Sequence, residues 1–186
     1  CLETHTHLLA SAPTGTGKTI AALFPAIQYA WLNDKKVYFG TSKTTQQHLA
    51  AGTVRMLIDR GLEVNAVVLR SAEKMCANET FFCHEDYCPF AREYRRRFEK
   101  SELREKLYEH KLLLPDQIYD MGVKEMLCPF EASLDFALRA DVVIGDYNYI
   151  FDPAVHLGRL FTVKDYADWI LVLDEAHNLL ERGMNW

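Results

Sequence analysis

This 186-residue sequence lacks several features that would assign it to a common protein class. Its formal net charge is −5, so it has no overall basic character, and nucleic acid could be bound only through a local patch. It has no signal peptide ahead of its first apolar segment and no apolar run long enough to cross a membrane. We therefore expect no membrane partner and a protein that works inside the cell, in the cytoplasm or nucleoid, or in the nucleus of a eukaryote.

Internal repeats and low-complexity tracts are also missing. The composition is that of a folded protein, because 49% of the residues are hydrophobic, 12% are aromatic and only 25% are charged. A chain of this length can bury one core and carry one subdomain. Because disulfides are rare inside cells, clustered cysteines are more often metal ligands there.

Short apolar segments alternate with segments of helical periodicity over most of the chain. We expect strands at 7–11, 36–41, 64–69, 141–145 and 169–174, and helices at 18–31, 44–60 and 130–139. Pro25 is expected to kink the first helix, and Gly61 to end the second. Strands that are apolar throughout and separated by helices predict an α/β fold, a parallel sheet with helices on both faces.

The alternation stops between residues 71 and 128, where the sequence holds several cysteines and a highly charged helical run. We interpret this segment as an insertion into the α/β layer. The predicted organisation is a first part of the α/β domain at 1–70, the insertion at 71–128, and a second part of the same domain at 129–186.

A glycine-rich loop, SAPTGTGKT at residues 11–19, lies between the first predicted strand and the first predicted helix. Gly15 and Gly17 allow the backbone to turn its N–H groups toward phosphate oxygens, and the helix N-terminus adds partial positive charge. Lys18 can reach the β- and γ-phosphates of a nucleotide, and Thr19 can bind Mg²⁺. The strict phosphate-loop pattern has glycine at Ala12, so the match is to a relaxed form; the alternative is an ordinary glycine-rich turn. The expected nucleotide-binding residues are Thr14, Gly15, Thr16, Gly17, Lys18, Thr19 and Asp174.

Two carboxylates follow the last predicted strand, in the sequence DEAH at residues 174–177. Ligands in open α/β sheets bind at the carboxyl ends of the strands. Asp174 is therefore expected to hold Mg²⁺ together with Thr19, and Glu175 to act as general base on the attacking water. The alternative is an acidic cluster at a helix start, which is common.

A phosphate loop of the APTGTGKT type combined with DEAH resembles superfamily 2 helicases and translocases. The resemblance implies a RecA-like fold and ATP-driven movement on nucleic acid. It also implies that His177 couples the state of the nucleotide to the nucleic-acid path. The expected catalytic residues are Lys18, Asp174, Glu175 and His177.

Four cysteines follow the pattern C-x6-C-x4-C-x39-C, at Cys76, Cys83, Cys88 and Cys128. Structural zinc sites usually use two tight pairs, and these intervals are looser. Iron–sulfur clusters also take four thiolates, with more variable spacing. From spacing alone, zinc, an iron–sulfur cluster and buried free thiols all remain open.

The context of these cysteines resembles the XPD/DinG family of iron–sulfur helicases. Cys128 begins a Cys-Pro-Phe sequence, which is followed by an ADVV-like segment at 140–144 and by DYNYIFDP at 146–153, before DEAH. The resemblance implies a [4Fe-4S] cluster on Cys76, Cys83, Cys88 and Cys128, with His84 left as a non-ligand. It further implies binding to single-stranded DNA or a forked duplex, and 5′→3′ travel.

Three groups of residues are candidates for nucleic-acid contact. The segment after the second predicted strand resembles motif Ia of the family and suits phosphate contacts, although it could be only a capped helix start. Two tyrosines could stack on bases or pack in the core, and the arginines of the charged helix could bind DNA or form a solvated face. The residues are Thr41, Ser42, Lys43, Thr44, Gln46, Tyr147, Tyr149, Arg95 and Arg96.

The sequence thus predicts the first motor domain of an ATP-dependent DNA helicase, using ATP, Mg²⁺ and a [4Fe-4S] cluster. A second RecA-like domain does not follow DEAH within these residues, so we expect the isolated chain to bind nucleotide weakly and to unwind nothing. Two alternatives are a non-translocating binding module controlled by nucleotide or redox state, and a superfamily 2 remodeller stapled by zinc. The sequence indicates no particular protein partner.

Overall fold

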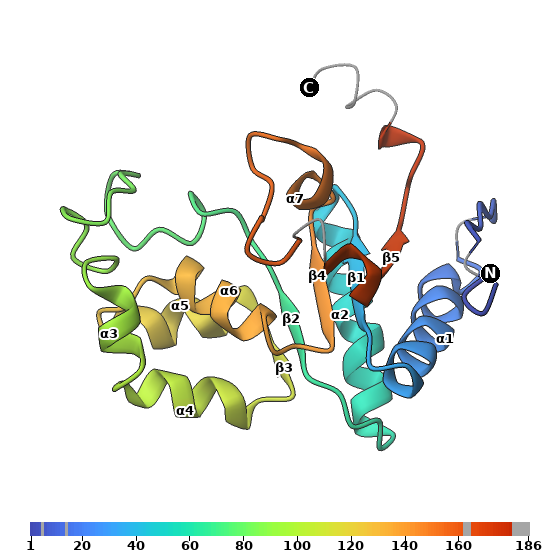
Figure 1. Ribbon diagram of the computed structural model, residues 1–186, viewed down its shortest axis with the longest axis horizontal. Coiled ribbons are helices and arrows are strands. Elements are labelled where there is room, and N and C mark those ends of the chain that lie inside the picture. The colour runs from blue at the N-terminus through green and yellow to red at the C-terminus, as the bar shows by residue number, and fades with distance from the viewer. Residues whose placement is uncertain (5, 14, 162–164, 180–186) are drawn as a thin grey trace.

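A parallel five-stranded sheet forms the centre of the fold in the computed structural model, which describes residues 1–4, 6–13, 15–161 and 165–179 (Figure 1). The strands are β1 Lys36–Gly40, β2 Ala66–Val68, β3 Leu112–Leu113, β4 Val142–Gly145 and β5 Trp169–Leu173. Their order across the sheet is β3-β2-β4-β1-β5, and every pair is parallel. The predicted parallel α/β sheet is confirmed.

Helices cover both faces of this sheet, as predicted. On one face lie α1 (Lys18–Leu32) and α2 (Thr44–Asp59), which pack on Val37, Phe39 and the other strand residues that point to that face. On the opposite face Tyr38, Val67 and Val143 pack against a second set of helices. This set comprises α3 Tyr94–Phe98, α4 Glu102–Glu109, α5 Pro115–Lys124, α6 Pro129–Ala137 and α7 Asn148–Phe151, with a short 3₁₀ turn, η1 Asp165–Asp168, before β5. Neighbouring residues of a strand pack on opposite faces of the sheet because successive side chains of a strand point in opposite directions.

The carboxyl ends of the three strands β4, β1 and β5 meet at one edge. Gly40 aligns with Gly145 on one side and with Leu173 on the other. The C-terminus of α1 lies at the amino edge of the sheet, because only residues 33–35 separate it from the start of β1. The 15-residue helix is about 22 Å long, so its N-terminus lies at the carboxyl edge. The glycine-rich loop before α1 and the DEAH residues after β5 are therefore both at the carboxyl edge (Figure 1).

Close packing at this edge leads to a stability prediction. A Cβ atom on Gly145 would lie 2.5 Å from the hydroxyl of Tyr38, whose ring is fully buried between Phe161 and Trp169 and cannot move away. Gly145→Ala should lower the free energy of unfolding by about 1–3 kcal/mol, as other overpacked cores do. Urea denaturation measures this loss. The control is Gly52→Ala in α2, where a Cβ would meet no atom within 4 Å and helix propensity favours alanine, so an equal loss there would contradict the packing argument.

One predicted strand is wrong. Residues 7–11 form no strand, and Leu8 and Leu9 are 74% and 91% exposed. A strand needs a hydrogen-bonding partner, and among the described residues β5, the nearest sheet edge, pairs with β1 alone. α1 continues through Pro25 to Leu32, and the kink expected at Pro25 stays a prediction.

The segment 71–128 contains more regular structure than its sequence suggested. Its charged run divides into α3 and α4 because Ser101 adopts an extended conformation and hydrogen-bonds through its hydroxyl to the Phe98 carbonyl at 2.8 Å. The same segment supplies β3, which extends the sheet beside β2, and α5. In the part of the chain that the structure describes, no helix is long and apolar enough to span a membrane.

Candidate nucleotide site and cysteine pocket

The glycine-rich loop has the backbone geometry that phosphate loops need. Gly15 and Gly17 adopt φ values of 80° and 76°, in the left-handed region that favours glycine. Gly17 is the N-cap of α1, so the free N–H groups of the first helical turn point toward the loop that precedes the helix. Residues 15–17 are exposed and accessible to a ligand. Thr14 lies outside the described residues.

Side chains of this loop fold back onto its own backbone. The Lys18 ammonium donates to the Ala12 carbonyl at 3.2 Å, and the Thr16 hydroxyl donates to the Pro13 carbonyl at 2.8 Å. Thr19 follows in the first turn of α1 and is half-buried. Lys18 must leave Ala12 to reach an anion, and an ammonium on a flexible stem can do so at little cost.

The acidic residues at the end of β5 are held by the backbone. The Asp174 N–H donates to the Gly40 carbonyl at 2.9 Å, and the Asp174 carboxylate accepts the Glu175 N–H at 3.1 Å. Glu175 has a φ of 54°, an unfavourable left-handed conformation for a residue with a side chain, and Asn178 fastens this turn by donating its side-chain amide to the Glu175 carbonyl at 3.1 Å. Strained residues of this kind are concentrated at functional sites.

Glu175 and His177 form a pair. Their side chains lie 3.6 Å apart, with the carboxylate 20% exposed and the imidazole 71% exposed. The His177 imidazole, which solvent or a partner can reach, therefore shields one side of the half-buried Glu175 carboxylate. This arrangement can link proton transfer at Glu175 to whatever contacts His177.

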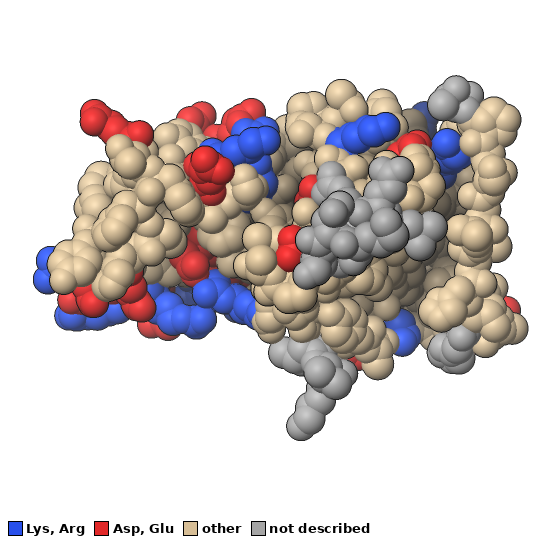
Figure 2. Space-filling view, turned by 90° about the horizontal axis from the view of Figure 1, so that it is seen from above, with Lys and Arg blue, Asp and Glu red and all other residues tan. Residues whose placement is uncertain are grey.

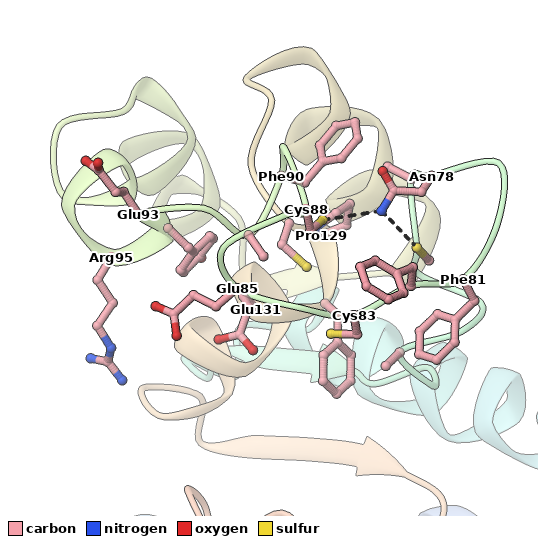
Figure 3. Close-up of a pocket in the computed structure, with 18 of the residues that line it drawn as sticks. Asn78, Phe81, Cys83, Glu85, Cys88, Phe90, Glu93, Arg95, Pro129 and Glu131 are labelled. Carbon is pink, nitrogen blue, oxygen red and sulfur yellow. Dashed lines mark hydrogen bonds between the residues drawn. The ribbon is translucent and has the colours of Figure 1, made fainter.

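All four predicted cysteine ligands line one pocket of about 590 Å³ (Figure 3). The Asn78 side-chain amide lies 3.6 Å from the sulfur of Cys76 and 3.3 Å from that of Cys88, and so joins two of them. The Cys128 N–H donates to the Phe90 carbonyl at 3.0 Å, which ties the fourth cysteine to the loop carrying the other three. The walls are largely aromatic, formed by Phe81, Phe82, Phe90, Tyr94 and Phe130.

Burial affects the acidity of two of the pocket thiols, Cys83 and Cys128. Burial raises the pKa of Cys128 to about 11, although backbone N–H groups at the start of α6 partly oppose this, and burial also raises the pKa of Cys83. The sulfur donors suit an iron–sulfur cluster or zinc. In the described part of the chain, no three potential ligand side chains lie close enough together to hold a metal ion, so binding would have to draw the sulfur atoms inward.

One arginine fastens the cysteine loop to the helices beneath it. The Arg97 guanidinium donates to the carbonyls of Pro89 at 2.9 Å and Arg92 at 3.1 Å, and also to that of Met126. These carbonyls belong to the segment after Cys88 and to the segment before Cys128. Arg97 therefore holds the third and fourth cysteines near each other.

The candidate nucleic-acid residues divide by exposure. Lys43 and Thr44 at the start of α2 are exposed, Ser42 and Gln46 are half-buried, and Arg95 and Arg96 on α3 are exposed. Figure 2 shows basic and acidic side chains intermixed at the end of the molecule that carries α3, where Arg96 pairs with Glu93 at 3.0 Å.

Three candidates are corrected by burial. Thr41 is 0% exposed, and its hydroxyl accepts the Lys43 N–H at 3.4 Å, so it shapes the loop and does not face solvent. Tyr147 and Tyr149 are 0% and 7% exposed, which agrees with core packing and leaves neither ring free to stack on a base.

Sequence reasoning missed several polar residues of the cysteine pocket. Asn78 lies within the cysteine loop and could have been suspected from its position. Arg159 and Glu131, which meet at 2.8 Å across the pocket wall, are 28 residues apart, and no local pattern indicates their contact.

Comparisons with known proteins show the family and the fold of the chain. A family model described as DEAD_2 matches residues 42–185. The "Regulator of telomere elongation helicase 1 homolog" of Anopheles gambiae is 23% identical over an alignment 233 residues long, gaps included, covering 96% of this chain and 23% of the relative. The "Fanconi anemia group J protein homolog" of Gallus gallus is 31% identical over 64 residues, covering 34% of this chain and 5% of that protein. The chain thus spans less than a quarter of the length of these curated relatives.

Two solved structures share the fold. The structure called "Truncated XPD" has a TM-score of 0.59 at 20% identity, covering 90% of this chain and 47% of that one. The structure called "XPD_Helicase" has a TM-score of 0.54 at 20% identity, covering 91% of this chain and 29% of that one. The parallel sheet therefore has the RecA-like fold of these structures. Because the family model covers most of its length, the chain belongs to the DEAD_2 family of XPD/DinG-like superfamily 2 helicases.

Proposed function

We propose that this chain is the first, ATP-binding motor domain of a DNA helicase that moves 5′→3′ along single-stranded DNA. The proposal is supported by the placement of two motifs on the carboxyl side of the sheet: a loop with left-handed Gly15 and Gly17 precedes α1, and Asp174 and Glu175 follow β5. An anion-binding turn and carboxylates on the same side of a sheet suit a magnesium nucleotide. A second RecA-like domain of the full-length protein completes the site.

Each residue of the nucleotide site has a distinct proposed role. Lys18 releases the Ala12 carbonyl and neutralises the β- and γ-phosphates, while Thr19 and Asp174 hold Mg²⁺. Glu175 takes the proton of the attacking water, and the strained backbone at Glu175 fixes where that carboxylate points. His177, which is exposed beside Glu175, contacts nucleic acid or the second domain and couples that contact to the nucleotide site.

The cysteine pocket is the proposed site of a [4Fe-4S] cluster held by Cys76, Cys83, Cys88 and Cys128. The all-sulfur donor set and the aromatic walls support this assignment. A bound cluster would cross-link the cysteine loop to the N-terminus of α6. His84 stacks with Phe82 at a ring-centroid distance of 6.2 Å, packs at a tilt against Tyr87 at 4.8 Å, and is not needed as a ligand.

The proposed DNA path uses the exposed polar groups at the start of α2. Ser42, Lys43, Thr44 and Gln46 lie where β1 ends, next to the DEAH edge, and can contact backbone phosphates. Arg95 and Arg96 on the cysteine-pocket side provide a second contact, which neighbouring acidic residues weaken because they offset the positive charge.

Measuring ATP hydrolysis with and without single-stranded DNA tests the motor proposal. The full-length protein should hydrolyse ATP faster when DNA is added, whereas the isolated 186 residues should bind nucleotide weakly and show no stimulation, because the site is shared with a second domain. Robust DNA-stimulated hydrolysis by the isolated chain would contradict the shared site. A full-length protein that binds ATP and DNA but never hydrolyses ATP would instead be a non-translocating module.

A further inference from the structure

A half-buried arginine, Arg159, lies in the wall of the cysteine pocket. The Arg159 guanidinium lies 2.8 Å from the Glu131 carboxylate and 3.5 Å from that of Asp135, one turn further along α6. Arg159 and Glu131 both line the pocket, as do the four cysteines. The Arg159 side chain is 30% exposed, so solvent screens its charge less than that of a surface cation.

The position of Arg159 is fixed by its neighbours. Leu160 and Phe161 are 3% and 1% exposed, and the Leu160 carbonyl accepts the indole N–H of Trp169 at 3.2 Å. Arg159 therefore projects from an anchored backbone and does not depend on a flexible loop for its placement. Its partners on α6 stand three and seven residues after Cys128, the cysteine that caps this helix.

The other charges on the pocket wall do not replace Arg159. Arg96 is 73% exposed on its side chain and pairs with Glu93, and Arg95 is exposed. Figure 3 shows the carboxylates of Glu85 and Glu131, which add negative charge to the same wall. A pocket that is to hold four thiolates beside these carboxylates needs a nearby cation, since like charges in a partly buried site repel strongly.

We propose that Arg159 is the electrostatic positioning residue of the cysteine pocket: it neutralises Glu131 and Asp135 and so stabilises the negative charge that a thiolate-bound iron–sulfur cluster brings. This inference rests on the proposed cluster and adds a residue outside the cysteine motif. A cation near a cluster favours the more reduced, more negative form, and thereby raises the reduction potential. Glu131 acts in the opposite direction.

Protein electrochemistry on the full-length protein, purified without oxygen, tests this assignment. Arg159→Met should lower the equilibrium constant for one-electron reduction about tenfold, which corresponds to a potential about 59 mV more negative. Arg159→Lys, which keeps the charge, should stay close to wild type, and Glu131→Gln should shift the potential upward. The matched control is Arg70→Met, because Arg70 is 28% exposed and pairs with Asp116 at 2.6 Å, but does not line the pocket.

The direction of the shifts in reduction potential distinguishes an electrostatic role of Arg159 from a purely structural one. Loss of structure would move Arg159→Met and Glu131→Gln in the same direction, since both variants break the same ion pair, and that result would overturn the inference. Unchanged potentials in an iron-replete Arg159→Met protein would overturn it as well. Wild-type protein that contains no iron would refute the proposed cluster and this inference together.

Discussion

Full-length protein with Glu175 replaced by glutamine is expected to hydrolyse ATP at least about 100-fold more slowly than wild type, while still binding it. Glutamine keeps the shape of the side chain but cannot take a proton from the attacking water. The turn that holds Glu175 depends on hydrogen bonds of the Glu175 backbone, whose N–H donates to the Asp174 carboxylate and whose carbonyl accepts from Asn178, and the substitution leaves these in place. Steady-state hydrolysis and binding of a fluorescent ATP analogue measure the two effects separately.

Glu109→Gln provides the matched control, because Glu109 is an exposed glutamate at the end of α4, away from the nucleotide site. It should leave both hydrolysis and binding unchanged. If Glu175→Gln retained near-normal hydrolysis, another group would have to be the general base. If the variant lost nucleotide binding as completely as hydrolysis, Glu175 would hold the nucleotide and not act in proton transfer.

The second large effect is expected at the cysteine pocket. Cys88→Ser should lower bound iron and acid-labile sulfide at least about tenfold in protein purified without oxygen, because a hydroxyl is a poor replacement for a thiolate ligand. Cys88 is 7% exposed and shares the Asn78 amide with Cys76, so it lies among the other sulfur atoms. The wild-type protein should be brown, and the variant should lose this colour with the iron.

Cys1→Ser serves as the control, because Cys1 is exposed and does not line the pocket. It should keep the iron content of the wild type. Colourless wild-type protein with one bound zinc would contradict the iron–sulfur assignment and favour the zinc-stapled remodeller. Metal analysis of the wild type and both variants decides between these outcomes.

The sheet and its motifs could be predicted because their signals are local. Apolar strands such as Val142–Gly145 are buried on both faces, and their composition shows it directly. Gly15 and Gly17 mark a left-handed turn by residue type alone. Residues 7–11 have the same apolar composition as a strand, but strand formation also needs a pairing partner, which local sequence does not specify.

Long-range packing accounts for what could not be predicted. Thr41, Tyr147 and Tyr149 carry groups suited to nucleic acid, and only the packing of β1, β4 and α7 shows that they are buried. The contact between Arg159 and Glu131 joins α6 to the segment before β5, and no periodicity links them. Fold class was therefore readable from the sequence, the chemistry of the motifs stays a prediction, and the electrostatics of the cysteine pocket were not readable.

Strand displacement by the full-length protein, purified without oxygen, tests the central proposal most directly. Duplexes with a single-stranded 5′ tail or 3′ tail would be supplied with ATP and Mg²⁺, and Glu175→Gln protein would serve as the inactive reference. We predict ATP-dependent unwinding of the 5′-tailed duplex alone. Unwinding only from the 3′ tail would contradict the direction, and no ATP-dependent displacement of either duplex would contradict the assignment of this domain to a helicase motor.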